Sequence, residues 1–119
     1  PEIYGSSYPT PDGTCIRDYI HVQDLAKAHI AALKRCESGF TSAIYNVGSG
    51  RGYSVKEMMA QISETLGRDI NPQESPARAG DSPKLIASIE KIESELGWKP
   101  VATLKEMIDS SWDAERSNS

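Results

Sequence analysis

Two arginines of this sequence stand in segments that are rich in turn-forming residues. Arg17 follows "YPTPDGTCI", and Arg78 opens "RAGD". A guanidinium group is planar and binds phosphate through two parallel hydrogen bonds, so two loop arginines that converge would suit a diphosphate. Asp81, three residues after Arg78, is a natural acceptor for ribose hydroxyls. Spacing alone leaves a plainer interpretation open, in which each arginine is a surface residue or pairs with a carboxylate such as Asp18.

The histidines and cysteines indicate neither a catalytic triad nor a metal site. His29 falls on the apolar face of a predicted helix, where we expect a core imidazole with its hydrogen bonds satisfied. His21 has no serine or cysteine nucleophile attached that would complete a triad. Cys15 and Cys36 are far apart, and together with the two histidines they form no recognisable ligand set. We therefore predict no bound metal and two reduced thiols.

The stretch "AIYNVGSGRGYSVKEMM", residues 43–59, invites comparison with a phosphate-binding loop. A dinucleotide fingerprint requires G-x-G-x-x-G between a strand and a helix. Gly48 and Gly50 fit that pattern, but Tyr53 stands at its third glycine. No Gly-Lys-Ser/Thr follows either, so the nucleotide-triphosphate pattern fails. We interpret the stretch as a plain strand-to-helix turn that binds no cofactor.

The elements that must position these residues can be predicted from periodicity and capping patterns. Apolar residues recur at helical spacing from Val22 to Cys36 and predict a helix packed through one face; these residues are Val22, Leu25, Ala26, Ile30 and Leu33. Ser54 with Glu57, and Thr103 with Glu106, form capping boxes that begin two further amphipathic helices.

Shorter elements complete the predicted order. Gly67 ends the helix that Ser54 begins, and Ser88 caps a short helix that stops at Gly97. Strands are expected at the start of the chain, within "CIRDYIHV", at "AIYNV" and within "DINPQES", whereas "PARAGDSP" is a loop. Because strands and helices alternate, the fold class is predicted as α/β with some parallel pairing.

Length and charge exclude several classes of protein. The 119 residues suffice for about one domain. The net charge of −4 shows no basic surface, so we expect no nucleic-acid partner. No apolar run approaches the roughly 20 residues that a bilayer demands, so we expect no membrane segment and a cytoplasmic location.

Four segments, in order and in register, resemble the carboxyl-terminal portion of UDP-glucose 4-epimerases, members of the extended short-chain dehydrogenase/reductase family. These segments are "YPTPDGTCIRDYIHVQDLAKAHIAAL", "YNVGSGRGYSVKEM", "RAGDSPKLIAS" and "ELGWKP". Related dehydratases and decarboxylases usually carry other residues in place of the Tyr-Ile-His of "RDYIHV". The resemblance therefore favours 4-epimerases, with hexosamine and pentose epimerases left open.

The resemblance implies an isomerase of galactose metabolism with two lobes. In this family an amino-terminal Rossmann lobe holds NAD and carries a Tyr-x-x-x-Lys catalytic pair, and the smaller lobe binds the UDP-sugar. NAD takes hydride from C4 of the sugar, and the 4-keto intermediate rotates and takes it back on the other face. Neither the catalytic pair nor the NAD loop occurs here. Residues 1–119 are thus expected to be a single partial domain, the substrate-binding lobe, inactive alone and part of a homodimer when complete.

The resemblance also assigns roles to single residues. Arg17 and Arg78 match the arginines that bind the UDP diphosphate, and Asp81 matches the ribose-binding aspartate. Tyr4 matches the aromatic residue beside the uracil, and Leu85 lies at a position that lines the hexose pocket. Some family members carry a bulky tyrosine at the position of Leu85, so a smaller residue could admit an N-acetyl group.

One departure from the family pattern and two alternatives stay open. Ala79 stands where a glutamate is common. The first alternative is a UDP-N-acetylhexosamine 4-epimerase or another nucleotide-sugar epimerase or dehydratase. The second is a non-catalytic remnant that binds a nucleotide sugar or a protein partner.

Overall fold

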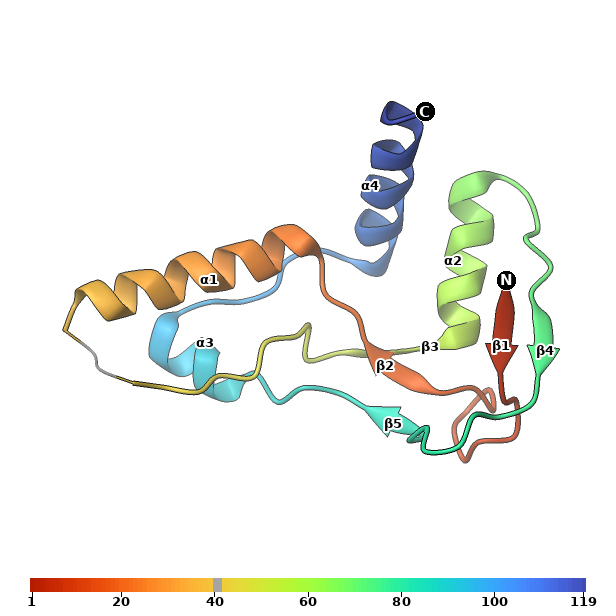
Figure 1. Ribbon diagram of the computed structural model, residues 1–119, viewed down its shortest axis with the longest axis horizontal. Coiled ribbons are helices and arrows are strands. Elements are labelled where there is room, and N and C mark those ends of the chain that lie inside the picture. The colour runs from red at the N-terminus through yellow and green to blue at the C-terminus, as the bar shows by residue number, and fades with distance from the viewer. Residues whose placement is uncertain (40–41) are drawn as a thin grey trace.

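A computed structural model describes residues 1–39 and 42–119 as short strands and helices spread over a long, flat body (Figure 1). The Cα radius of gyration is 17.0 Å, compared with about 13.5 Å for a compact domain of this length. The principal extents are 51 × 37 × 20 Å. The chain therefore does not close around one large core, and most of its elements have one face in solvent.

Within the described residues, five strands form two small sheets. β1 (Glu2–Tyr4) pairs in parallel with β4 (Gln73–Ser75). β2 (Ile16–Asp18) is the middle strand of the second sheet, antiparallel to β3 (Gly52–Ser54) and parallel to β5 (Lys84–Leu85). The strands expected at the start of the chain and within "CIRDYIHV" and "DINPQES" are confirmed, whereas β3 and β5 were not predicted.

In the part of the chain that the structure describes, four helices connect and flank these sheets: α1 (Val22–Glu37), α2 (Val55–Leu66), α3 (Glu90–Leu96) and α4 (Leu104–Ser117). Both predicted capping boxes are confirmed, at the start of α2 and of α4. α2 ends, as predicted, at Gly67 with φ of 65°. Ser88 does not cap α3, since Ile89 occupies the N-cap position and no side chain caps that helix.

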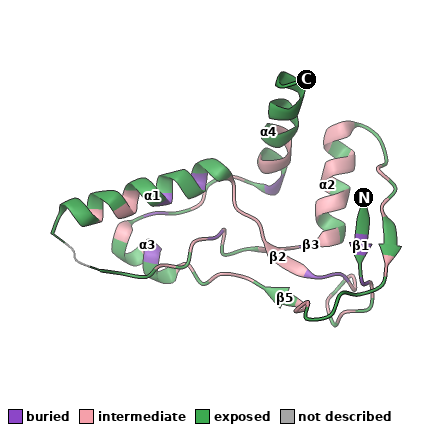
Figure 2. Ribbon diagram, viewed as in Figure 1, coloured by how far each residue is buried: buried purple, intermediate pink, exposed green. Residues whose placement is uncertain are grey.

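The predicted packing face of α1 is wrong. Val22, Ile30 and Leu33 are 75%, 53% and 59% exposed, and the helix is mostly solvent-facing (Figure 2). The buried residues of α1 are Asp24 and Ala28. The small Ala28 side chain lets α3 and Trp98 approach closely, and Asp24 binds the chain that precedes α4, so this face is the one turned inward.

The imidazole of His29 follows the exposed face of α1. We predicted a core imidazole, but His29 is exposed, and Nδ1 donates to the Leu25 carbonyl one turn earlier at 2.8 Å. The helical period placed His29 correctly beside the apolar residues. The prediction fails because that whole face points to solvent in this chain.

A buried hydrophobic cluster lies between α1 and α3. Ala28, Ile92 and Trp98 form its centre. The Trp98 indole Nε1 donates to the Asp24 carbonyl at 3.0 Å, which satisfies the polar atom of an otherwise apolar side chain. This cluster fixes α3 to α1, while α2 packs separately against α4.

The strand predicted for "AIYNV" is also wrong. Residues 43–47 pair with no strand among the residues that the structure describes. The segment runs beside α3 instead, where the Tyr45 hydroxyl donates to Glu95 at 2.6 Å and the Lys91 ammonium donates to the Ile44 carbonyl at 2.9 Å. A strand requires a paired neighbour, and an apolar run alone does not supply one.

Candidate functional site

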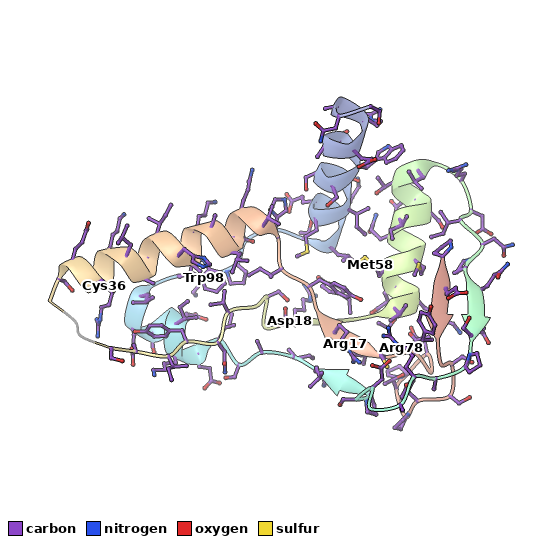
Figure 3. The ribbon with its side chains drawn as sticks, viewed as in Figure 1. Arg17, Asp18, Cys36, Met58, Arg78 and Trp98 are labelled. Carbon is purple, nitrogen blue, oxygen red and sulfur yellow. The ribbon has the colours of Figure 1, made fainter. Side chains whose placement is uncertain are left out.

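Four of the five predicted site residues line one recess. The recess has a volume of about 210 Å³, and its lining includes Tyr4, Arg17, Arg78 and Asp81. These side chains come from β1, from β2 and from the loop before β5. Figure 3 shows the two arginines close to the point where the two sheets meet. The topology thus brings together residues that lie as far apart in sequence as β1 and the "RAGD" loop.

Arg17 is held by two backbone carbonyls. Its Nη1 donates to the Ile16 carbonyl at 2.9 Å and to the Ser82 carbonyl at 2.7 Å. Among the described residues, no acceptor is recorded for Nη2 and Nε. A guanidinium carries five N–H donors in a fixed plane, so Arg17 is fixed in place with donors left for a ligand.

Arg78 is more exposed and is held by Asp81 and Tyr4. Its Nε donates to Asp81 Oδ2 at 3.1 Å, and its Cζ lies 4.6 Å from the centre of the Tyr4 ring. The side chains of Arg78 and Asp81 are 62% and 22% exposed. An ion pair this exposed contributes at most about 1 kcal/mol, so a phosphate can readily attract the guanidinium.

Tyr4 presents a flat, neutral ring to the recess. Its hydroxyl donates to the Glu2 carboxylate, and this hydrogen bond, together with the negative charge of Glu2, raises the pKa of Tyr4. The phenol therefore stays protonated at neutral pH. The arrangement suits a surface on which a base can lie, and it does not suit a general base.

Other lining residues were not predicted from the sequence. Cys15 and Tyr19 line the same recess as Arg17, because alternate residues of a strand point to the same face. Burial raises the pKa of Tyr19. The period-two spacing of these three positions around β2 was the sequence signal that could have found them.

Leu85 lies beside the recess and outside its lining. It is 56% exposed and stands opposite Arg17 in the parallel register of β2 and β5. Residues at paired positions of neighbouring strands project from the same face of a sheet. The predicted role of Leu85 at a hexose therefore stays a prediction, with a position next to Arg17 as its structural context.

The glycine loop before β3 does bind an anion, but that anion belongs to the chain itself. The backbone amides of Ser49 and Gly50 donate to the Asp18 carboxylate at 2.7 and 3.0 Å. These amides are engaged, so the loop does not fit the pyrophosphate of a dinucleotide. The sequence-based interpretation, that the loop binds no cofactor, agrees with this geometry.

His21 has a structural role. It is the N-cap residue of α1, where its Nδ1 accepts from the Gln23 amide at 3.0 Å, and its Nε2 lies 2.9 Å from Ser110 Oγ. Within residues 1–39 and 42–119, no three His, Cys, Asp or Glu side chains gather as a metal-binding group. No helix in those ranges is long and apolar enough to cross a bilayer.

Comparison with known proteins places this geometry in a family. The sequence model of the family described as GDP-mannose 4,6 dehydratase matches residues 5–111. The chain belongs to this family. A UDP-glucose 4-epimerase of Corynebacterium glutamicum is 49% identical over 111 residues, which are 92% of this chain and 33% of that protein.

Solved structures show the same likeness. A UDP-glucose 4-epimerase crystal structure matches with a TM-score of 0.94 and 42% identity, over 98% of this chain and 36% of the other. The UDP-glucose 4-epimerase of Bifidobacterium longum, in complex with NAD⁺ and UDP, matches with a TM-score of 0.85 and 41% identity, over 98% of this chain and 35% of the other. The UDP-Glc/GlcNAc 4-epimerase of Campylobacter jejuni matches with a TM-score of 0.86 and 40% identity, over 97% of this chain and 35% of the other. The mixed α/β class is confirmed, and the chain spans about a third of the length of these relatives.

Proposed function

We propose that residues 1–119 are the UDP-sugar-binding part of a UDP-glucose 4-epimerase, an enzyme that interconverts UDP-glucose and UDP-galactose. The observation that carries the proposal is the convergence of Arg17, Arg78, Asp81 and Tyr4 on one recess. The relatives named UDP-glucose 4-epimerase support the choice of reaction.

The recess supplies a donor, an acceptor or a flat surface for each part of UDP. The Tyr4 ring would lie beside the uracil. Asp81 Oδ2 accepts a hydrogen bond from Arg78 Nε, which leaves Oδ1 to accept a hydrogen bond from a ribose hydroxyl. Arg17, through Nη2 and Nε, and Arg78, through its terminal nitrogens, would bind the diphosphate with charge-assisted hydrogen bonds.

The chemical steps lie with residues outside this chain. No tyrosine here is followed by lysine four positions later, and the Asp18 carboxylate fills the glycine loop. NAD, which accompanies several related structures, would be held by another part of the protein. The recess of about 210 Å³ is also smaller than the roughly 300–1,000 Å³ of ligand pockets, so it encloses only part of a UDP-sugar.

The test is an epimerase assay with UDP-glucose and UDP-galactose on two samples. We expect the full-length protein that carries this segment to convert both sugars and the 119-residue chain to convert neither. Turnover by the isolated chain would overturn the proposed division of labour. An inactive full-length protein that still binds UDP-sugar would favour the non-catalytic remnant.

A second candidate is an epimerase that also accepts N-acetylated sugars. It is favoured by Leu85 at the position where some family members carry a tyrosine, and a relative from Campylobacter jejuni is named as a UDP-Glc/GlcNAc 4-epimerase. Leu85→Tyr should lower turnover of UDP-N-acetylglucosamine at least about tenfold while sparing UDP-glucose, because a filled pocket excludes the acetyl group. Equal effects on both sugars would reject this role.

Two further expectations stay predictions. The homodimer of the full-length protein rests on the resemblance, and the cytoplasmic location rests on the composition of the sequence. Size-exclusion chromatography with light scattering would test the first, and fractionation of the source cells would test the second.

A further inference from the structure

The Asp18 carboxylate is one of the most heavily hydrogen-bonded side chains of the second sheet. Its Oδ1 accepts from the Ser49 amide and hydroxyl, both at 2.7 Å. Its Oδ2 accepts from the amides of Gly50 and Ala87, at 3.0 and 3.1 Å. A carboxylate with two oxygens offers about four acceptor sites, so these donors fill the positions that it has.

These bonds join three segments that are distant in sequence. Asp18 ends β2, Ser49 and Gly50 belong to the loop before β3, and Ala87 follows β5. Figure 3 labels Asp18 at the end of β2, next to Arg17. One carboxylate thus ties both neighbours of the middle strand to it at the same end of the sheet.

The glycines around this loop are explained by the same contact. A Cβ on Gly48 would lie 2.6 Å from Asp18 Oδ2 and 2.8 Å from the Ala87 side chain. Gly50 has φ of 68°, a conformation that side chains rarely adopt. The loop "VGSG" is therefore shaped for close approach to an internal carboxylate, as glycine loops elsewhere are shaped for phosphate.

Arg17 and Asp18 together hold the chain that carries Leu85. The Arg17 guanidinium binds the Ser82 carbonyl at 2.7 Å, and the Asp18 carboxylate binds the Ala87 amide at 3.1 Å. The segment 82–87 is thereby fastened at both ends, with Leu85 between the two attachments. β5 itself is only two residues long, so ladder hydrogen bonds alone hold it weakly.

We propose that Asp18 is a positioning residue for the sugar-binding end of the site. It fixes residues 85–87 relative to Arg17, and so sets where Leu85 stands with respect to a sugar whose diphosphate Arg17 holds. The inference rests on the proposed function, because it requires a UDP-sugar at this recess. The glycine loop thus affects the substrate indirectly, because it holds the Asp18 carboxylate and Asp18 holds the segment that follows β5.

The test compares the affinities of the full-length protein for UDP and for UDP-glucose by calorimetry. Asp18→Asn turns an amide N–H toward donors that need an acceptor. This change should loosen residues 85–87 more than it disturbs the contacts of Arg17 and Arg78 with the diphosphate. We expect UDP-glucose to bind about tenfold more weakly and UDP to change less than about threefold, so the ratio of the two dissociation constants shifts by several-fold. Asp113→Asn, on an exposed part of α4, is the control and should leave both unchanged.

Ser49→Ala is a second, milder variant that removes the hydroxyl donor to Asp18 and the acceptor of the Arg51 amide but keeps the Ser49 and Gly50 backbone donors. It should shift the same ratio in the same direction by about twofold to threefold, and it decides the matter if Asp18→Asn does not fold. The positioning role is overturned if Ser49→Ala leaves the ratio unchanged and Asp18→Asn either leaves it unchanged or does not fold. It is also overturned if the variants weaken the binding of UDP and of UDP-glucose equally. Wild-type protein that binds neither ligand refutes the proposed function, and the inference with it.

Discussion

Replacing Arg17 by alanine should separate the two halves of the proposed ligand, the nucleoside and the diphosphate. Arg17 Nη1 is already bonded to the Ile16 and Ser82 carbonyls, so a phosphate can gain one or two hydrogen bonds from Nη2 and Nε. A hydrogen bond to a charged group contributes about 1.5–3 kcal/mol net. Loss of one such bond should lower UDP affinity by about 1.5–3 kcal/mol, or roughly 10- to 150-fold, and loss of two should lower it further.

Calorimetric titration of the full-length protein with UDP and with uridine would measure this loss. Uridine lacks phosphate, so its affinity should change less than about threefold. Arg17→Lys keeps the charge but not the planar fork, and it should fall between wild type and Arg17→Ala. Arg116→Ala, which breaks an exposed ion pair on α4, is the matched control. Unchanged UDP affinity in Arg17→Ala, or equal weakening of UDP and uridine, would refute the diphosphate assignment.

Two predictions concern stability. Asp24→Ala should lower the free energy of unfolding by about 3 kcal/mol. The buried carboxylate accepts hydrogen bonds from the amides of Val101 and Ala102, and both donors lose their partner in the variant. Urea denaturation of the full-length protein measures this change, and a value below about 0.5 kcal/mol would contradict the prediction. Stability should also fall as pH drops through about 4, because the pKa of Asp12 lies below its ordinary value in the folded protein. Burial raises the pKa of Asp12, but the hydrogen bonds from Ser54 and Thr14 lower it by more than burial raises it. A carboxyl group with a lowered pKa in the folded state stabilises above its unfolded pKa and loses that contribution in acid. Urea midpoints that are equal at about pH 6 and pH 3 would contradict the linkage.

The features that the sequence predicted well depend on neighbours within one helical turn. The capping boxes of Ser54 and of Thr103 formed as expected, because each needs only a glutamate three residues later. Helix ends at Gly67 and Gly97 are equally local, since glycine adopts the left-handed conformation that ends a helix.

The features that failed depend on distant partners. The hydrophobic pattern of α1 marks an apolar face correctly, but the partners of Asp24 lie at Val101 and Ala102, and these contacts turn another face inward. The two residues of β5 are a strand only because β2 lies beside them. Periodicity carries no information about which segment reaches which face.

The candidate site divides in the same way. Arg17, Arg78 and Asp81 stood out by residue type and by resemblance, and all three line one recess. Asp18 appeared in the sequence only as a carboxylate that Arg17 could pair with. Its donors are 31 to 69 residues away in sequence, so its role emerges only when the sheet is assembled.

The most direct test of the central claim is a crystal structure of the full-length protein with UDP. We expect diphosphate oxygens within about 2.7–3.2 Å of the Arg17 and Arg78 guanidinium groups. We also expect the uracil beside Tyr4 and the Asp18 carboxylate still bound in the glycine loop. UDP bound elsewhere, with both arginines turned away from its phosphates, would refute the proposed UDP site.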